Sequence, residues 1–176
     1  MDLKDNKYIY LRSLLFLAIF IGMHYAYRFF PNVIIQLISP IDESVFQHMK
    51  NGFYTYLIIV VIEFLIFKKK ITNKTNYLFS RIFSMILYPW IMFLLFFFTR
   101  VVYPWQMHFV VEIISAQITV FISALIIGFI ETDFIKIEYR KRLKVLLVIL
   151  IVLLIIEFTV FTFSLPWHDV LANPYG

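Results

Sequence analysis

The sequence predicts an all-α polytopic membrane bundle of five transmembrane helices in a single domain, residues 1–176. Hydrophobic residues make up 62% of the chain and charged residues only 15%, and the mean hydropathy is +0.86. That balance is typical of a chain dissolved in lipid. A helix needs about 20 mostly apolar residues to cross the hydrocarbon core, and five stretches have that length. They are residues 8–30, 44–67, 77–99, 107–129 and 145–164.

Each of the first three spans has, in it or beside it, a sequence feature that predicts part of its structure. Residues 8–30 form a long apolar run that no small-residue cleavage site follows, which indicates a retained anchor. The second span, 44–67, follows a polar segment rich in helix-capping residues. The third span, 77–99, has Pro89 near its centre, where the ring removes a backbone hydrogen bond and predicts a kink.

The last two spans contain carboxylates inside apolar sequence. Span 107–129 carries Glu112 one helical turn after His108, and Glu157 interrupts the aliphatic run of span 145–164. A lone carboxylate in such a run needs a partner, and we expect Arg100, Lys50 or a histidine to supply it.

The distribution of basic residues predicts the orientation. The amino-terminal segment, the second connection and the fourth connection hold 13 of the 16 basic residues, and the opposite side holds only Arg28, Lys50 and Arg100. The positive-inside rule therefore predicts a cytoplasmic amino terminus and an outside carboxyl terminus in a cell membrane. Because these basic clusters flank membrane spans, anionic lipid headgroups are the expected partners and nucleic acid is not. The chain has no cysteine, which excludes disulfides and thiolate metal ligands.

Polar side chains from four spans fall at a similar expected depth. His24, His48, Glu112 and Glu157 come out roughly 9 to 13 Å below the outer ends of their helices, at a rise of about 1.5 Å per residue. His108 lies one turn from Glu112 on the same helical face. Ionisable groups at such a depth are candidates for function. The fourth histidine, His168, lies in the polar tail after the last span.

The segment 39–51 combines a helix start with a polar surface. Ser39 suits an N-cap, Pro40 the first helical position and Asp42 the capping box. Two adjoining polar stripes then follow at helical spacing, and we expect them to face protein or water and not lipid. The stripes are Glu43, Gln47 and Lys50, and Ser44, His48 and Asn51.

This segment resembles an uncharacterised family of small bacterial membrane proteins with a motif close to S-P-V-N-E-S-V-W-E-H-x-K. Glu43, Ser44, His48 and Lys50 match the motif, as the residues quoted above show. At three further positions this chain has Asp42 for Asn, Phe46 for Trp and Gln47 for Glu. His24 with Tyr25 and Tyr27, and a closing Asn173-Pro174-Tyr175-Gly176, extend the resemblance over most of the chain. The resemblance implies that the matching residues matter and implies no particular reaction.

The polar residues support a first hypothesis, a metal-dependent membrane hydrolase. Imidazole and carboxylate ligands make a zinc site whose free position holds a water molecule. The expected ligands are His48, His108 and Glu112, with His24 as an alternate. Glu43 or Glu157 is the expected general base, and Arg100 or Lys50 the group that holds an anionic headgroup. A site near the outer leaflet suits a lipid or a membrane-embedded peptide as substrate.

Two other classes stay open, so the sequence does not decide whether the chain is an enzyme. The first is a metal or small-solute binding or transport protein acting as a homodimer, in which methionines beside three histidines suit copper. The second is an accessory subunit of a membrane complex, with the polar residues joining helices. In that structural interpretation Glu63, near the cytoplasmic end of its span, pairs with Lys68 or Arg81.

Overall fold

The chain forms a bundle of helices in the computed structural model, which describes residues 5–102 and 108–164. Within these residues there are six α-helices and no strand. Five of them are long and apolar enough to cross a membrane, which confirms the predicted all-α fold and number of spans. The helices are α1 (Asn6–Phe29), α2 (Val33–Ile38), α3 (Val45–Phe67), α4 (Lys74–Val102), α5 (Phe109–Phe134) and α6 (Lys141–Phe163).

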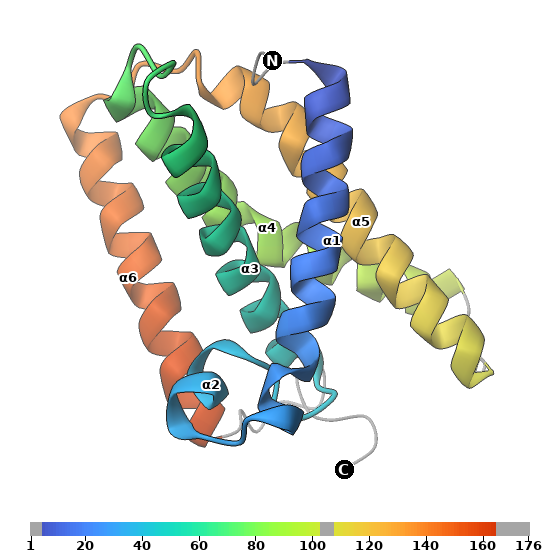
Figure 1. The fold of residues 1–176 in the computed structure, drawn as a ribbon. Helices are drawn as coiled ribbons and strands as arrows, with labels where there is room; N and C mark the ends of the chain where they lie inside the picture. The colour runs from blue at the N-terminus through green and yellow to red at the C-terminus, as the bar shows by residue number, and fades with distance from the viewer. Residues whose placement is uncertain (1–4, 103–107, 165–176) are drawn as a thin grey trace.

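Four of the long helices form a closed ring of contacts, and the other two helices pack on this ring. Helix α3 lies between α1 and α4, and α5 lies against both α1 and α4. Helix α6 packs on α4, and its Phe158 ring contacts Phe46 and Phe53 of α3 at tilted angles. The short helix α2 contacts α1, α3 and α6 at the end of the bundle where α3 begins (Figure 1).

Aromatic side chains fill the centre of the bundle. Phe16 and Phe20 of α1 pack with Tyr56 of α3 and Tyr88 of α4, and all four are almost fully buried. The outer surfaces of the helices are covered by exposed leucine, isoleucine, valine and phenylalanine side chains. In a membrane this surface is solvated by lipid chains, and the aromatic interior supplies the packing contacts that hold helices together there.

Helix α3 begins later than the capping pattern predicts. The prediction of Ser39 as its N-cap is wrong, because Ser39 ends α2 and an extended segment separates the two helices. The N-cap of α3 is Ser44, whose Oγ accepts a hydrogen bond from the Gln47 amide at 3.3 Å. Asp42 stabilises a turn within the segment, because its Oδ1 accepts a hydrogen bond from the Ser44 amide at 2.8 Å. Ser44, five positions after Ser39, is therefore the residue that caps α3.

Helix α4 continues through Pro89 and packs tightly on α3. The proline removes one hydrogen bond of the helix, and Figure 1 shows α4 changing direction along its length. One residue before it, the Tyr88 ring lies directly over Gly52 of α3, where a Cβ atom would meet Cε1 at 2.5 Å. Glycine is therefore required at position 52 for the two helices to approach this closely.

We predict that Gly52→Ala destabilises the bundle by about 1–3 kcal/mol, because the added methyl group must displace the buried Tyr88 ring. Gly22→Ala is the matched control, since nothing lies within 4 Å of the added atom there. Thermal unfolding in one detergent measures both variants. Equal melting temperatures for the two would contradict the close approach of α3 and α4.

Candidate metal site and the buried ion network

Four charged side chains from four helices meet inside one end of the bundle. Arg12 of α1 lies 2.9 Å from Glu63 of α3 and 2.5 Å from Glu131 of α5, measured between nitrogen and oxygen. Arg81 of α4 lies 3.2 Å from Glu63 and also pairs with Glu131. The exposed fractions of these side chains are between 2% and 7%. The two positive and two negative charges sum to zero, as a low-dielectric interior requires.

Tyrosine hydroxyls add hydrogen bonds to this ion network. Tyr8 donates to Glu63, and Tyr56 donates to Glu131 at 2.8 Å while accepting from Arg12 at 2.7 Å. The Arg12 guanidinium also lies 4.9 Å from the centre of the Tyr56 ring, within the range of a cation–π contact. Each carboxylate is thus bound by both arginines and by tyrosine, which offsets much of the cost of burying it.

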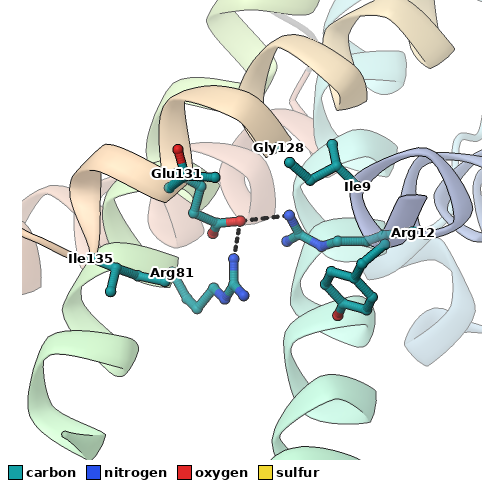
Figure 2. A pocket seen from close by; sticks show the side chains of 8 residues that line it. Ile9, Arg12, Arg81, Gly128, Glu131 and Ile135 are labelled. Carbon is teal, nitrogen blue, oxygen red and sulfur yellow. Dashed lines mark hydrogen bonds and ion pairs between the residues drawn. The ribbon is translucent and has the colours of Figure 1, made fainter. Parts of the chain in front are cut away.

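The cavity beside the network is too small for a substrate. Figure 2 shows the Glu131 carboxylate between the two guanidinium groups, with Gly128 and Ile9 closing one side. Its volume is about 10 Å³, which is room for about one water molecule. The network therefore joins helices α1, α3, α4 and α5 and is not itself a ligand site.

The sequence predicts only part of this network. The pairing of Glu63 with Arg81 is confirmed. Arg12 and Arg81 are among the 13 basic residues that the positive-inside rule places beside the spans, but both are buried. Glu131 was assigned to a connection because span 107–129 was ended too early, and α5 runs to Phe134. The available sequence signal was one acid or one arginine in each of four helices, all at the same expected depth.

The other end of the bundle holds a cluster of three side chains that could together hold a metal ion. His24 of α1, His48 of α3 and Glu43 of the segment between α2 and α3 each place a ligand atom within 4.8 Å of the others. The Nε2 atom of His24 lies 3.5 Å from Glu43 Oε1, and that of His48 lies 3.5 Å from Glu43 Oε2. The two imidazole rings are 5.2 Å apart. In the described residues no other group of three such side chains comes this close.

The segment that carries Glu43 is fixed to α1 by Ser39. The Ser39 hydroxyl donates to the Met23 carbonyl at 2.6 Å and accepts from the Tyr27 amide at 3.1 Å. These two backbone groups are one helical turn apart. The hydroxyl therefore bridges them at the turn of α1 that contains His24, which sets the segment beside that histidine.

The backbone also orients His48. Its Nδ1 atom lies 2.8 Å from the Ser44 carbonyl, and because a carbonyl only accepts, Nδ1 must carry the hydrogen. The Nε2 atom then presents its lone pair to Glu43 and His24. A hydrogen bond of this kind, from the second ring nitrogen to a carbonyl, is what fixes the orientation of metal-ligating histidines.

A cavity of about 290 Å³ opens beside the cluster. Glu43, whose side chain is 55% exposed, lies at its edge, while His24 and His48 are 17% and 26% exposed. The cluster is therefore reached from outside the bundle and supported from within. The cavity is lined by His24, Tyr25, Tyr27, Arg28, Pro40, Ile41, Asp42 and Glu43.

The polar stripe of α3 faces protein, as the sequence predicts. Gln47, Lys50 and Asn51 are all fully buried. Lys50 Nζ donates to the Gln36 carbonyl of α2 at 2.8 Å and to Thr162 Oγ1 of α6 at 3.0 Å. Its charge thus lies at the carboxyl-terminal end of α2, where a cation is favoured, and it ties α2, α3 and α6 together.

The remaining predicted residues lie away from the cluster. His108 caps the start of α5, with Glu112 in the first turn, and Figure 1 shows that α5 begins well away from α2. Glu157 lies half-buried on α6, and Arg100 lies near the end of α4. The structure therefore brings together His24, His48 and Glu43 of the eight predicted residues, and His168 lies outside the described residues.

These features define a multi-pass membrane protein with a buried ion network at one end and a histidine–carboxylate cluster at the other. The chain belongs to a family of unknown function, DUF6512, whose model matches residues 2–175. This match confirms the assignment to an uncharacterised family. No curated protein and no solved structure matches the chain.

We predict that Glu131→Gln destabilises the protein by about 3–5 kcal/mol, because two buried arginines are left with one carboxylate. The control is Glu138→Gln, which removes the same charge from an exposed side chain and is expected to change the stability by less than about 0.5 kcal/mol. Unfolding by denaturant in mixed micelles gives both values. Similar losses for the two variants would show that the ion network does not hold the helices together.

Proposed function

We propose that the chain is a metal-dependent membrane hydrolase whose divalent ion is bound by His24, Glu43 and His48. The observation that carries the proposal is the approach of three ligand atoms from α1, α3 and the intervening segment to within 4.8 Å of one another. The sequence predicts His24 and His48 as ligands and Glu43 as a base. In the proposal Glu43 becomes the third ligand, and His108 and Glu112 have no part in the site.

The ligand geometry suits zinc. In a tetrahedral shell with bonds near 2.0–2.1 Å, neighbouring ligand atoms are about 3.4 Å apart. Each histidine has one Glu43 oxygen at a similar separation of 3.5 Å, Oε1 for His24 and Oε2 for His48. Nitrogen and oxygen donors without sulfur favour zinc over copper(I). Met49, next to His48, packs in the aromatic core, so it supports no thioether ligand.

Three protein ligands leave a fourth position for water, the arrangement of catalytic zinc sites. A bound ion supplies Lewis acidity and lowers the pKa of a water ligand towards neutrality. Asp42 lines the cavity, and while its Oδ1 accepts from the Ser44 amide, its second oxygen serves as the general base. Asp42 takes a proton from the attacking water and returns it to the leaving oxygen, so one ester bond and one water give an acid and an alcohol.

The expected orientation supports a membrane-borne substrate. Five of the basic residues that predict the cytoplasmic side lie between α3 and α4 or between α5 and α6, and three more lie in the first turns of α1, α4 and α6, all at the end opposite the cluster. The first five are Lys68, Lys69, Lys70, Lys136 and Arg140, and the other three are Lys7, Lys74 and Lys141. By the positive-inside rule the cluster then lies at the outer leaflet, where a lipid or membrane peptide reaches it without crossing the bilayer.

We predict that His24→Ala, His48→Ala and Glu43→Gln each abolish stoichiometric zinc binding by the detergent-purified protein, because two ligands hold zinc far more weakly than three. His108→Ala and Glu112→Gln are the matched controls at the same end of the bundle. Metal content by mass spectrometry, with the melting temperature as a check on folding, gives the answer. The proposal would be overturned if His108→Ala or Glu112→Gln also lost zinc, or if the wild-type protein contained none.

We predict that Ser39→Ala weakens zinc binding by about tenfold, because the segment carrying Glu43 loses its bond to α1 and outer-shell partners typically contribute 10- to 100-fold. Ser39→Thr keeps the hydroxyl and is expected to restore most of the affinity. Competition with a calibrated chelator measures both variants. Equal affinities for alanine and threonine would show that the hydroxyl does not position the site.

A further inference from the structure

We propose that the cavity beside the cluster binds the phosphate group of an amphiphile and that Arg28 holds this group against the metal. The proposal rests on the metal site proposed above and names the class of its substrate. Arg28 is a positioning and specificity residue in this arrangement, and it lies in the last turn of α1, one turn beyond His24.

Arg28 is a cation that lines the cavity. Among the residues that the structure describes, no hydrogen bond or ion pair joins its side chain to another residue. The other basic side chain described at this end, Lys50, is fully buried and bonded to Gln36 and Thr162. An anionic ligand in the cavity therefore meets one available guanidinium.

The two carboxylates of the cavity have other partners. Asp42 bonds to the Ser44 amide, and Glu43 lies between the two histidines. Neither carboxylate pairs with Arg28 in the described part of the chain, although all three residues line the same cavity. A divalent ion on the cluster would balance both carboxylates, and the guanidinium then adds a net positive charge, which favours an anion.

The chemistry of guanidinium favours phosphate. Its planar fork of donors matches two oxygens of a phosphate group and can hold them as a pair. Tyr25 and Tyr27, which line the same cavity, carry hydroxyls that can donate to further phosphate oxygens. The cavity of about 290 Å³ lies at the lower end of the range for small-molecule sites, so it suits a headgroup and not a whole lipid.

The surface next to the cavity indicates that the phosphate is attached to an apolar chain. Phe29 and Phe30 directly follow Arg28, and Val33 and Ile34 begin α2; all four side chains are exposed. At the end of a membrane span these side chains meet lipid. A ligand with its phosphate at Arg28 can therefore lay its acyl chains along this apolar flank.

The experiment compares binding of three probes to the zinc-loaded full chain in an uncharged detergent. The probes are a short-chain phosphatidic acid, the diacylglycerol of the same chain length and inorganic phosphate, followed by calorimetry. We expect the phosphatidic acid to bind best, and Arg28→Gln to weaken it by at least about tenfold, since a charge-assisted hydrogen bond contributes about 1.5–3 kcal/mol. Arg28→Lys keeps the charge without the fork and should fall between.

Arg140→Gln is the matched control, because it removes an exposed arginine before α6, at the other end of the bundle. If Arg28→Gln binds the phosphatidic acid as Arg140→Gln does, the proposal is overturned. If inorganic phosphate binds as tightly as the lipid, the amphiphile is overturned and the site takes a soluble phosphate. Metal content is measured on the same samples, so a wild type without zinc refutes the metal site separately from the loss of Arg28-dependent binding.

Discussion

Burying ionic groups in lipid is so costly that the four charges of the ion network must meet their opposites, and this constraint determines how four of the helices pack. Arg12, Glu63, Arg81 and Glu131 belong to four different helices, and each carboxylate contacts both arginines. A shift of any one helix by a turn, about 5.4 Å, would leave a charge unpaired. Apolar packing tolerates many relative heights of neighbouring helices, whereas this ion network forms at only one relative height.

The sequence predicted what depends on composition and period, and missed what depends on pairing between helices. The five spans follow from apolar length, and the burial of Gln47, Lys50 and Asn51 follows from their shared helical face. Convergence of His24 with His48 was expected from depth alone. Depth says nothing about position around the bundle, so His108 was grouped with residues that lie well away from the start of α5.

The N-cap of α3 was also predicted wrongly, and the reason lies in the segment between α2 and α3. Ser39 and Ser44 are both good capping residues, and sequence alone does not rank them. The structure uses Ser44 as the cap and Ser39 to fix the segment to α1. That choice takes Glu43 out of the helix and places it between two histidines, which a continuous helix from residue 39 would not have done.

The two polar centres also differ in how much of the chain each requires. All three proposed ligands lie between residues 24 and 48, within the segment formed by α1, α2 and α3, whereas the ion network needs Glu131 of α5. During synthesis, all three proposed ligands are therefore present once the first three helices have been made. The network closes only after most of the protein has entered the membrane, so the cluster has its ligands early and gains its rigid frame late.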